Sequence, residues 1–215
     1  MAKIISKEEA VKLIYSGSTI MVGGFLNCGT AQGIIDELSK SKINNLTLIA
    51  NDTSFPDKSY GKLIVNKQVS KVITSHIGTN PETGRQMKDK EIEVVLMPQG
   101  SLAEAIRAYG AGLGGIITPT GIGTLVEEGK QKITIKGKEY IIEEAISGDF
   151  AIVYADYADR AGNLAFSGST RNFNTIMPTA CKTTIVEAKE IIDGYLDPND
   201  IVVSSIFVDY IVKGE

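Results

Sequence analysis

The sequence predicts an α/β fold with an open, mostly parallel sheet that is covered by helices and carries one inserted antiparallel hairpin. Over the first 125 residues, short apolar runs of strand length alternate with amphipathic helical patterns, which is typical of a parallel sheet. Residues 132–143 break this pattern, because isoleucines alternate there with lysines and other polar residues. No repeat or linker composition divides the chain, so we expect a single domain over residues 1–215.

The composition is that of an ordinary soluble globular protein, with 43% hydrophobic and 22% charged residues. A net charge of −4 and the lack of a basic helix face argue against nucleic-acid binding. No run of about 18 apolar residues predicts a membrane span. The N-terminal segment has neither signal-peptide nor transit-peptide features. Cys28 and Cys181 have no metal-site spacing and are expected to be reduced, so we predict a cytoplasmic protein without a metal.

The first strand and the glycine loop after it form the central feature of the sequence. Thr19–Val22 reads as a buried strand, Gly23 and Gly24 break it, and a periodic apolar pattern predicts a helix over Gln32–Ser41. Adjacent glycines let the backbone lie close against a ligand, and a helix start beyond them offers free N–H groups to an anion. The alternative is a tight turn without a ligand. The loop matches neither usual nucleotide-binding fingerprint.

Polar residues follow the next two predicted strands. Leu46–Ala50 is a buried strand that ends at Asn51 and Asp52, and Val69–Ser75 is a strand that ends at His76. Open α/β sheets bind ligands at the carboxyl ends of their strands, although an Asx turn would also explain Asn51. We expect His76, the only histidine, to be a packed or capping residue rather than a catalytic one.

A third strand end carries a glutamine. Glu91–Met97 is predicted as a strand, and a helix over Ser101–Tyr109 follows, with Ser101 as its cap and Glu104 in the capping-box position. Gln99 is therefore expected in the loop between them. Its neutral amide can donate to a developing negative oxygen without a tuned pKa. The alternative is a buried glutamine that only satisfies backbone groups.

The second half of the chain has shorter elements. Six glycines within Gly110–Thr124 predict a compact loop around one short strand. Lys132–Glu143 predicts a hairpin that turns at Gly137. The other expected elements are a helix capped by Ser6, a helix or extended turn at 61–66, strands at 150–155, 164–166, 183–188, 201–203 and 207–212, a turn at 159–163, and a short helix after 170–174.

Several motifs follow one another along nearly the whole chain. They are Val22-Gly-Gly-Phe25 with Cys28-Gly29, Asn51-Asp52, Gly78-Thr-Asn80, Pro98-Gln-Gly100, Thr118-Pro-Thr-Gly-Ile-Gly-Thr124, Asp159-Arg160 with Gly162-Asn163, and Arg171-Asn-Phe-Asn174. In kind and order they resemble the alpha subunit of family I 3-oxoacid CoA-transferases, and most of all the bacterial acetate/butyrate–acetoacetate type. One departure is Gly29-Thr-Ala-Gln32, where the family commonly continues Gly-x-Pro-Glu.

The resemblance implies a fold like that of the CoA-transferase and ribose-5-phosphate-isomerase group, and a ping-pong transfer of CoA between acyl-CoA and a free acid. In the family, the nucleophilic glutamate lies in a Ser-Glu-Asn-Gly motif of the beta subunit. This chain has no Glu-Asn-Gly. The resemblance therefore implies half of an enzyme, with two alpha and two beta subunits. Coenzyme A would be a co-substrate, short 3-oxoacids would be substrates, and no cofactor would be permanently bound.

The resemblance also implies roles for individual residues. Gln99 would donate to the oxyanion of the tetrahedral intermediate, and Asn51 would position polar groups of the substrate. The family's proposed CoA-binding segment corresponds here to Gly24, Phe25, Leu26, Asn27, Cys28, Gly29 and Thr30.

Three alternatives remain open at the level of sequence. The first is a subunit of a 3-oxoadipate or succinyl-CoA type transferase. The second is a sugar-phosphate isomerase, which would need its own acid and base from Asp52, Asp156 and Asp159. The third is a regulatory module that binds CoA without a partner.

Overall fold

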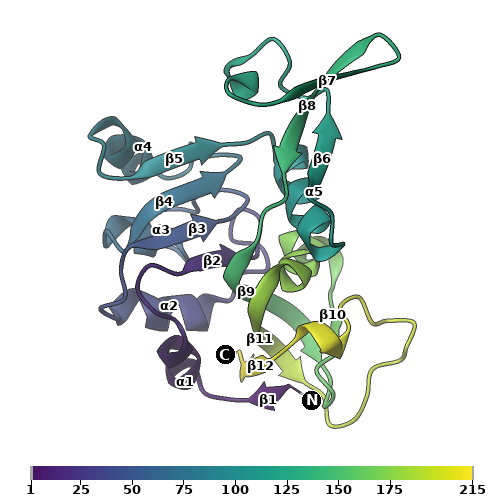
Figure 1. Cartoon of the computed structure of the whole chain (residues 1–215). Coiled ribbons are helices and arrows are strands. Elements are labelled where there is room, and N and C mark those ends of the chain that lie inside the picture. The colour runs from purple at the N-terminus through teal and green to yellow at the C-terminus, as the bar shows by residue number, and fades with distance from the viewer. Residues whose placement is uncertain (1, 215) are drawn as a thin grey trace.

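The computed structural model describes residues 2–214, which form a large sheet with helices and a small separate sheet (Figure 1). The strands of the large sheet are β1 (Lys3–Ile4), β2 (Thr19–Val22), β3 (Leu46–Ile49), β4 (Val69–Thr74), β5 (Glu93–Leu96), β9 (Gly148–Ala158), β10 (Leu164–Ala165), β11 (Cys181–Ile191) and β12 (Tyr210–Lys213). The helices are α1 (Lys7–Leu13), α2 (Gln32–Lys40), α3 (Gly61–Val65), α4 (Pro81–Lys88) and α5 (Gln99–Gly110).

The large sheet is open and almost entirely parallel. Its strand order is β1-β12-β11-β9-β2-β3-β4-β5, and all neighbours on this path run parallel. Only β10, which pairs with β9, is antiparallel. The predicted α/β fold with a mostly parallel sheet is confirmed. Strand β1, which pairs with β12, was not expected from the sequence.

Helices and turns bury both faces of the sheet. Along β2, Ile20 and Val22 point to one face and pack in a core with α1, α2 and α3. Met21 points to the other face, where its core includes α5 and the 3-10 turns after β10. The side-chain period of a strand produces this division. None of the helices between residues 2 and 214 is long and apolar enough to cross a membrane.

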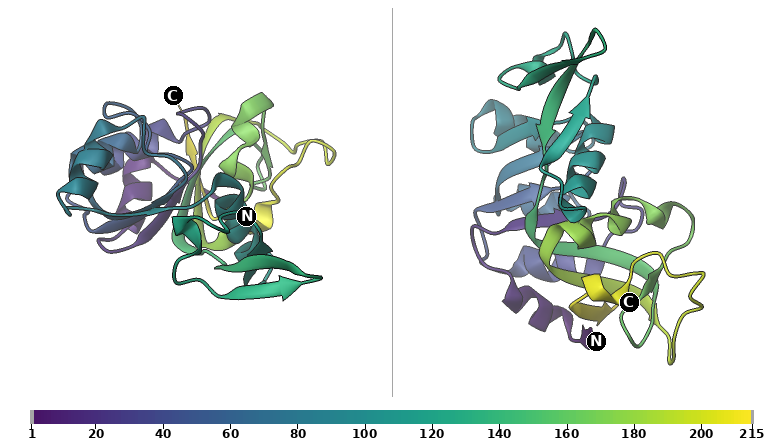
Figure 2. Two further views of the ribbon diagram at one scale, coloured as in Figure 1. Left: turned by 90° about the horizontal axis from the view of Figure 1, so that it is seen from above. Right: turned by 45° about the vertical axis from the view of Figure 1, so that its right-hand side comes forward.

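The predicted hairpin is confirmed and gains a third strand. Strands β7 (Lys132–Ile135) and β8 (Lys138–Glu144) form the hairpin, and β6 (Gly115–Thr118) pairs antiparallel with β8. A Cβ atom on Gly115 would lie 2.4 Å from the Glu143 carbonyl oxygen, so a glycine is needed for this pairing. The resulting three-stranded sheet projects from one end of the molecule as an arm (Figures 1 and 2).

The last third of the chain differs most from the prediction. The strand expected over 207–212 begins only at Tyr210 and runs to Lys213, because Ser205–Phe207 forms a 3-10 turn. The expected strand at 201–203 is reduced to one bridge between Val203 and Leu164. A series of 3-10 turns, η2 (Gly168–Arg171), η3 (Phe173–Thr175) and η4 (Met177–Ala180), replaces the expected short helix. Prolines, glycines and Asx-type bonds interrupt regular repeats there.

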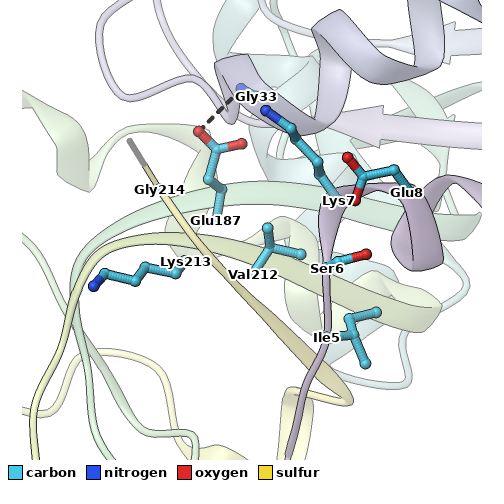
Figure 3. A pocket seen from close by; sticks show the side chains of 9 residues that line it. All are labelled: Ile5, Ser6, Lys7, Glu8, Gly33, Glu187, Val212, Lys213 and Gly214. Carbon is cyan, nitrogen blue, oxygen red and sulfur yellow. Dashed lines mark hydrogen bonds between the residues drawn. The ribbon is translucent and has the colours of Figure 1, made fainter.

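Helix α2 is capped by a residue that is far away in the sequence. Ala31, at the N-cap position, has no side chain that could bond the first turn. Instead the Gly33 and Ile34 amides donate to the two carboxylate oxygens of Glu187 on β11, at 3.0 and 2.8 Å. Figure 3 shows this carboxylate directed at the helix start. The expectation that this helix start offers free N–H groups to a ligand is therefore wrong for these two amides.

Glu187 lies at the wall of a small cavity of about 240 Å³ between α1, β12 and the start of α2. Its side chain is 6% exposed, and burial raises the pKa of its carboxyl group above the ordinary value. The two backbone donors and the nearby Lys7 act in the opposite direction but do not reverse this shift. Both oxygens of the Glu187 carboxylate therefore accept hydrogen bonds from the start of α2.

We expect Glu187→Ala to lower the free energy of unfolding by about 1–2 kcal/mol near neutral pH, because it leaves two helix-terminal amides without a partner. Since the folded-state pKa is raised, Glu187 contributes its full stabilisation only below the unfolded glutamate pKa of about 4.3, and part of it is lost as pH rises through the raised value. Chemical denaturation at several pH values should therefore show a larger deficit at acidic pH. The exposed neighbour Glu190 provides the control, since Glu190→Ala should stay within about 0.5 kcal/mol.

Candidate active site

An open cavity of about 430 Å³ lies at the carboxyl ends of β2, β3, β4 and β5. The segments that follow these four strands contribute its walls, as expected for ligand sites in open parallel sheets. The lining residues are Phe25, Leu26, Asn51, Asp52, Ser75, His76, Thr79 and Gln99. The structure therefore brings together Asn51 and Gln99, the two residues that the sequence singled out for the reaction.

Asn51 and Gln99 are joined by a direct hydrogen bond. The Gln99 Nε2 atom donates to Asn51 Oδ1 at 2.6 Å. Asn51 is only 2% exposed, and its backbone oxygen accepts from the Ser75 hydroxyl at 2.6 Å. Gln99 is exposed, and its amide nitrogen carries a second N–H. The buried Asn51 amide thus holds the exposed Gln99 amide, whose second N–H can still donate a hydrogen bond.

Gln99 lies on a helix and not in the loop where the sequence analysis placed it. Helix α5 begins at Gln99 with Pro98 at the N-cap position, and the Leu102 amide donates to the Pro98 carbonyl at 2.9 Å. The predicted cap at Ser101 is also wrong, because this residue lies inside the first turn and its hydroxyl has no partner. Proline suits a helix start since it has no N–H to satisfy. The helix backbone therefore fixes the position of Gln99.

Asp52 is a fully buried carboxylate beside this amide pair. Its Oδ2 atom accepts from the Leu26 amide at 3.0 Å and from Asn51 Nδ2 at 2.9 Å. Its Oδ1 atom accepts from the Ser54 amide at 2.7 Å and from the Tyr60 hydroxyl at 3.0 Å. Burial, together with the charge of Asp52, raises the pKa of Tyr60 well above its ordinary value, so the phenol remains a donor. All four donors converge on one side chain.

The glycine loop forms a tight turn at the rim of the cavity. Phe25 and Cys28 exchange two backbone hydrogen bonds, at 3.1 and 2.8 Å. Leu26 and Asn27, between them, have φ of +47° and +66°, as in a type I′ turn. Neither residue is glycine, and a leucine in this region is strained. The turn leaves Phe25 40% and Leu26 45% exposed at the cavity.

Two asparagines from the second half of the chain hold the loop from behind. Asn172 accepts from the Gly24 amide at 3.1 Å and donates to the Cys28 carbonyl at 3.0 Å. Asn174 donates to the Gly29 carbonyl at 2.7 Å. The Arg171-Asn-Phe-Asn174 motif therefore has a structural function in the site, which the sequence alone did not indicate.

Contacts within the chain require the glycines of the loop. A Cβ atom on Gly23 would lie 1.8 Å from Asn174 Oδ1, and one on Gly24 would lie 2.5 Å from Thr30 Oγ1. At Gly29 the nearest atom would be Asn174 Nδ2 at 3.0 Å. The tight-turn alternative thus accounts for the glycines, and a ligand could still contact the exposed side chains of the turn.

The carboxylates considered for an isomerase do not form an acid–base pair. Asp159 accepts from the Ala161 and Asn163 amides at 2.9 and 2.8 Å, as a turn residue does. Asp156 accepts from the Ser167 amide at 2.8 Å. Neither residue lines the cavity. The geometry therefore gives no support to isomerase chemistry.

Ser75 and His76 also line the cavity, a position that was not predicted for either residue. Both follow β4 directly, and His76 forms a parallel bridge with Asp52. They occupy the strand-end position that identified Asn51, so the same signal could have found them. Gly78 has no Cβ atom, which leaves room for the His76 ring, since a Cβ would lie 2.9 Å from its Cε1 atom.

A second cavity of about 330 Å³ shares Phe25 and Gln99 with the first. Arg107 on α5 and Arg171 also line it, and Arg171 Nε donates to the Phe166 carbonyl at 3.3 Å. Its apolar floor includes Ala103, Phe173 and Ile176. Arg107 is paired with Glu104 at 3.1 Å, so Arg171 is the cationic group that, with the apolar floor, suits a partly apolar and anionic ligand.

Comparison with known proteins places this geometry in context. Residues 4–214 match the family described as Coenzyme A transferase. The chain is 47% identical over 213 residues to the alpha subunit of the acetoacetyl-CoA:acetate/butyrate CoA transferase of Clostridium acetobutylicum, covering 99% of this chain and 98% of that protein. It is 48% identical over 214 residues to the alpha subunit of the acetate CoA-transferase of Escherichia coli K12, covering 99% and 97%.

Solved structures show the same fold at lower sequence identity. The acyl-CoA transferase of E. coli O157:H7, solved as a thioester complex with CoA, aligns with a TM-score of 0.86 at 22% identity. This alignment covers 99% of the present chain but only 47% of that one. Glutaconate coenzyme A-transferase from Acidaminococcus fermentans aligns with a TM-score of 0.86 at 20% identity, covering 99% and 76%.

We expect Gly23→Ala to lower the free energy of unfolding by about 1–3 kcal/mol, because the added methyl group displaces Asn174. Gly84→Ala is the matched control, since nothing lies within 4 Å of its Cβ position on α4. Alanine favours a helix over glycine by about 0.5–1 kcal/mol, so the control should be neutral or more stable. Chemical denaturation measures the stability of both variants. Equal stability of the two would contradict the close packing of Asn174 against Gly23.

Proposed function

This chain belongs to the coenzyme A transferase family as an alpha subunit, and we propose that, with a beta subunit, it moves CoA between a short-chain acyl-CoA and a 3-oxoacid such as acetoacetate. The name of the relative from C. acetobutylicum supports this pair of substrates, and the name of the relative from E. coli supports acetate as one of the acids. The alternative pair is succinyl-CoA with a 3-oxoacid such as 3-oxoadipate. A relative from Bacillus subtilis that is 44% identical is named as a subunit of a probable succinyl-CoA:3-ketoacid coenzyme A transferase.

The proposed reaction proceeds in two half-reactions. A glutamate carboxylate from the beta subunit first attacks the thioester carbonyl, and the CoA thiolate leaves from the tetrahedral intermediate to give an acyl-glutamyl anhydride. The thiolate then attacks the glutamyl carbonyl, which releases the acid and forms a glutamyl-CoA thioester. The second acid reverses these steps and leaves as a new acyl-CoA. Each attack places negative charge on a carbonyl oxygen that needs a donor.

The hydrogen bond between Gln99 and Asn51 is the observation that carries the proposal. Gln99 is exposed at the cavity, and its second N–H can donate to the oxygen that becomes negative. The helix start and the buried Asn51 hold this donor in place before the substrate arrives, as oxyanion stabilisation requires. Asn51 would position the polar groups of the substrate at the same wall.

We propose further that the segment Gly24 to Thr30 contacts coenzyme A, chiefly through the exposed Phe25 and Leu26. The adjoining cavity, with the guanidinium group of Arg171, would take anionic groups of the substrates. An assembly of two alpha and two beta subunits would complete the enzyme. Since Cys28 and Cys181 are both free, we propose a cytoplasmic location.

Replacement of Gln99 tests its role. In the assembled enzyme, Gln99→Ala should lower turnover by about 10²–10³, because one oxyanion donor is lost. Gln131→Ala, an exposed glutamine outside both cavities near Gln99, should leave turnover unchanged. Steady-state kinetics and size-exclusion chromatography would measure both variants. A decrease of less than a few-fold in Gln99→Ala, with assembly intact, would refute the assigned role.

Dependence on a partner tests the half-enzyme proposal itself. Exchange between acetoacetate and acetyl-CoA or butyryl-CoA is measured with the purified chain alone and after co-expression with a beta subunit that carries Ser-Glu-Asn-Gly. We expect exchange only in the co-expressed sample. Full activity of the chain alone would mean that it carries its own nucleophile.

A further inference from the structure

We propose that Asp52 is a positioning residue of the reaction, whose carboxylate fixes the direction of the Asn51–Gln99 amide pair and ties the Phe25–Cys28 turn to it. This inference rests on the proposed function of Gln99. Asp52 is 0% exposed, and every contact described for its two oxygens is to a donor of this chain. A buried, fully bonded carboxylate is suited to orient its neighbours.

The carboxylate of Asp52 sets the orientation of the Asn51 amide. An ionised carboxylate can only accept hydrogen bonds. The amide group of Asn51 must therefore turn its nitrogen toward Asp52, and Nδ2 lies 2.9 Å from Oδ2. This leaves the Asn51 Oδ1 atom on the opposite side of the amide, where it faces Gln99.

The orientation of Asn51 in turn sets the orientation of the Gln99 amide. Because Asn51 presents its oxygen to Gln99, Gln99 must donate from its amide nitrogen, and the two atoms lie 2.6 Å apart. The second N–H of that nitrogen is the donor assigned to the oxyanion. If the Asn51 amide were reversed, Gln99 would turn its Oε1 atom toward Asn51. A carbonyl oxygen would then stand where the amide nitrogen stands now, and it would repel a developing negative charge.

Asp52 also anchors the turn at the cavity rim. The Asp52 oxygen that holds Asn51 also accepts from the Leu26 amide at 3.0 Å. Leu26 has a strained φ of +47°, which needs such an anchor. One oxygen atom therefore sets both the rim of the cavity and the polarity of the amide pair.

The other oxygen of Asp52 offers a matched control. Tyr60 contacts only Oδ1, at 3.0 Å, and the Ser54 amide holds the same oxygen at 2.7 Å. Tyr60→Phe removes a buried hydrogen bond to the same carboxylate but leaves the bonds to Asn51 and Leu26 in place. It should lower the melting temperature and reduce kcat far less than Asp52→Asn does.

The test is a double-mutant cycle in the co-expressed enzyme. Asparagine at position 52 introduces an N–H₂ group opposite existing donors, so Asp52→Asn should lower kcat by about 10- to 100-fold with little change in KM. If Asp52 acts through Gln99, adding Asp52→Asn to Gln99→Ala should cost no further kcat. A purely structural role would give independent losses, and these would overturn the proposal. Unchanged kcat in an assembled Asp52→Asn enzyme would overturn it as well.

The cycle separates this inference from the proposed function. If Gln99→Ala itself leaves turnover unchanged, the oxyanion role fails and the inference fails with it. If kcat falls in Gln99→Ala but not in Asp52→Asn, only the positioning role is overturned. Should the asparagine variant fail to assemble, Asp52→Ser replaces it in the same cycle, because its hydroxyl still accepts and water can fill the remaining space.

Discussion

The parallel pairing of β2, β3, β4 and β5 is the constraint on which the candidate site depends. Parallel strands end at the same edge of a sheet, so the residues that follow them meet although they are far apart in the sequence. Asn51 and Gln99 are separated by 48 positions and still share a hydrogen bond of 2.6 Å. Changes in the strand order would separate every wall of the cavity.

Buried polar side chains then fix what the sheet brings together. Asp52 holds the turn at Leu26, Asn174 holds the loop at Gly29, and Glu187 holds the start of α2. Each of these side chains bonds backbone groups that would otherwise be unsatisfied, and such groups are costly in a low-dielectric interior. Hydrogen bonds from buried side chains therefore hold the loops of the site in their positions.

The cavity is also open to the outside where Gln99 and the Phe25–Cys28 turn lie. Gln99 is exposed, and the strained Phe25–Cys28 turn presents apolar side chains to the cavity. Under the proposed function, a beta subunit would bring the nucleophile to this surface. A pre-arranged donor on one chain and a nucleophile on the other would couple catalysis to assembly, because neither chain by itself holds both groups.

The sequence by itself determined the class of the fold and most elements of the first 110 residues, though not β1 or α4, and it pointed to Asn51 and Gln99 as polar residues at strand ends. These follow from hydrophobic periodicity and from polar residues at strand ends, which are local signals. It did not reveal the cap that Glu187 supplies or the two asparagines that hold the glycine loop. Those depend on residues more than 20 positions apart, and their pairing is decided only when the sheet forms. The start of α5 at Gln99 was misplaced because Pro98 begins the helix before the apparent capping box.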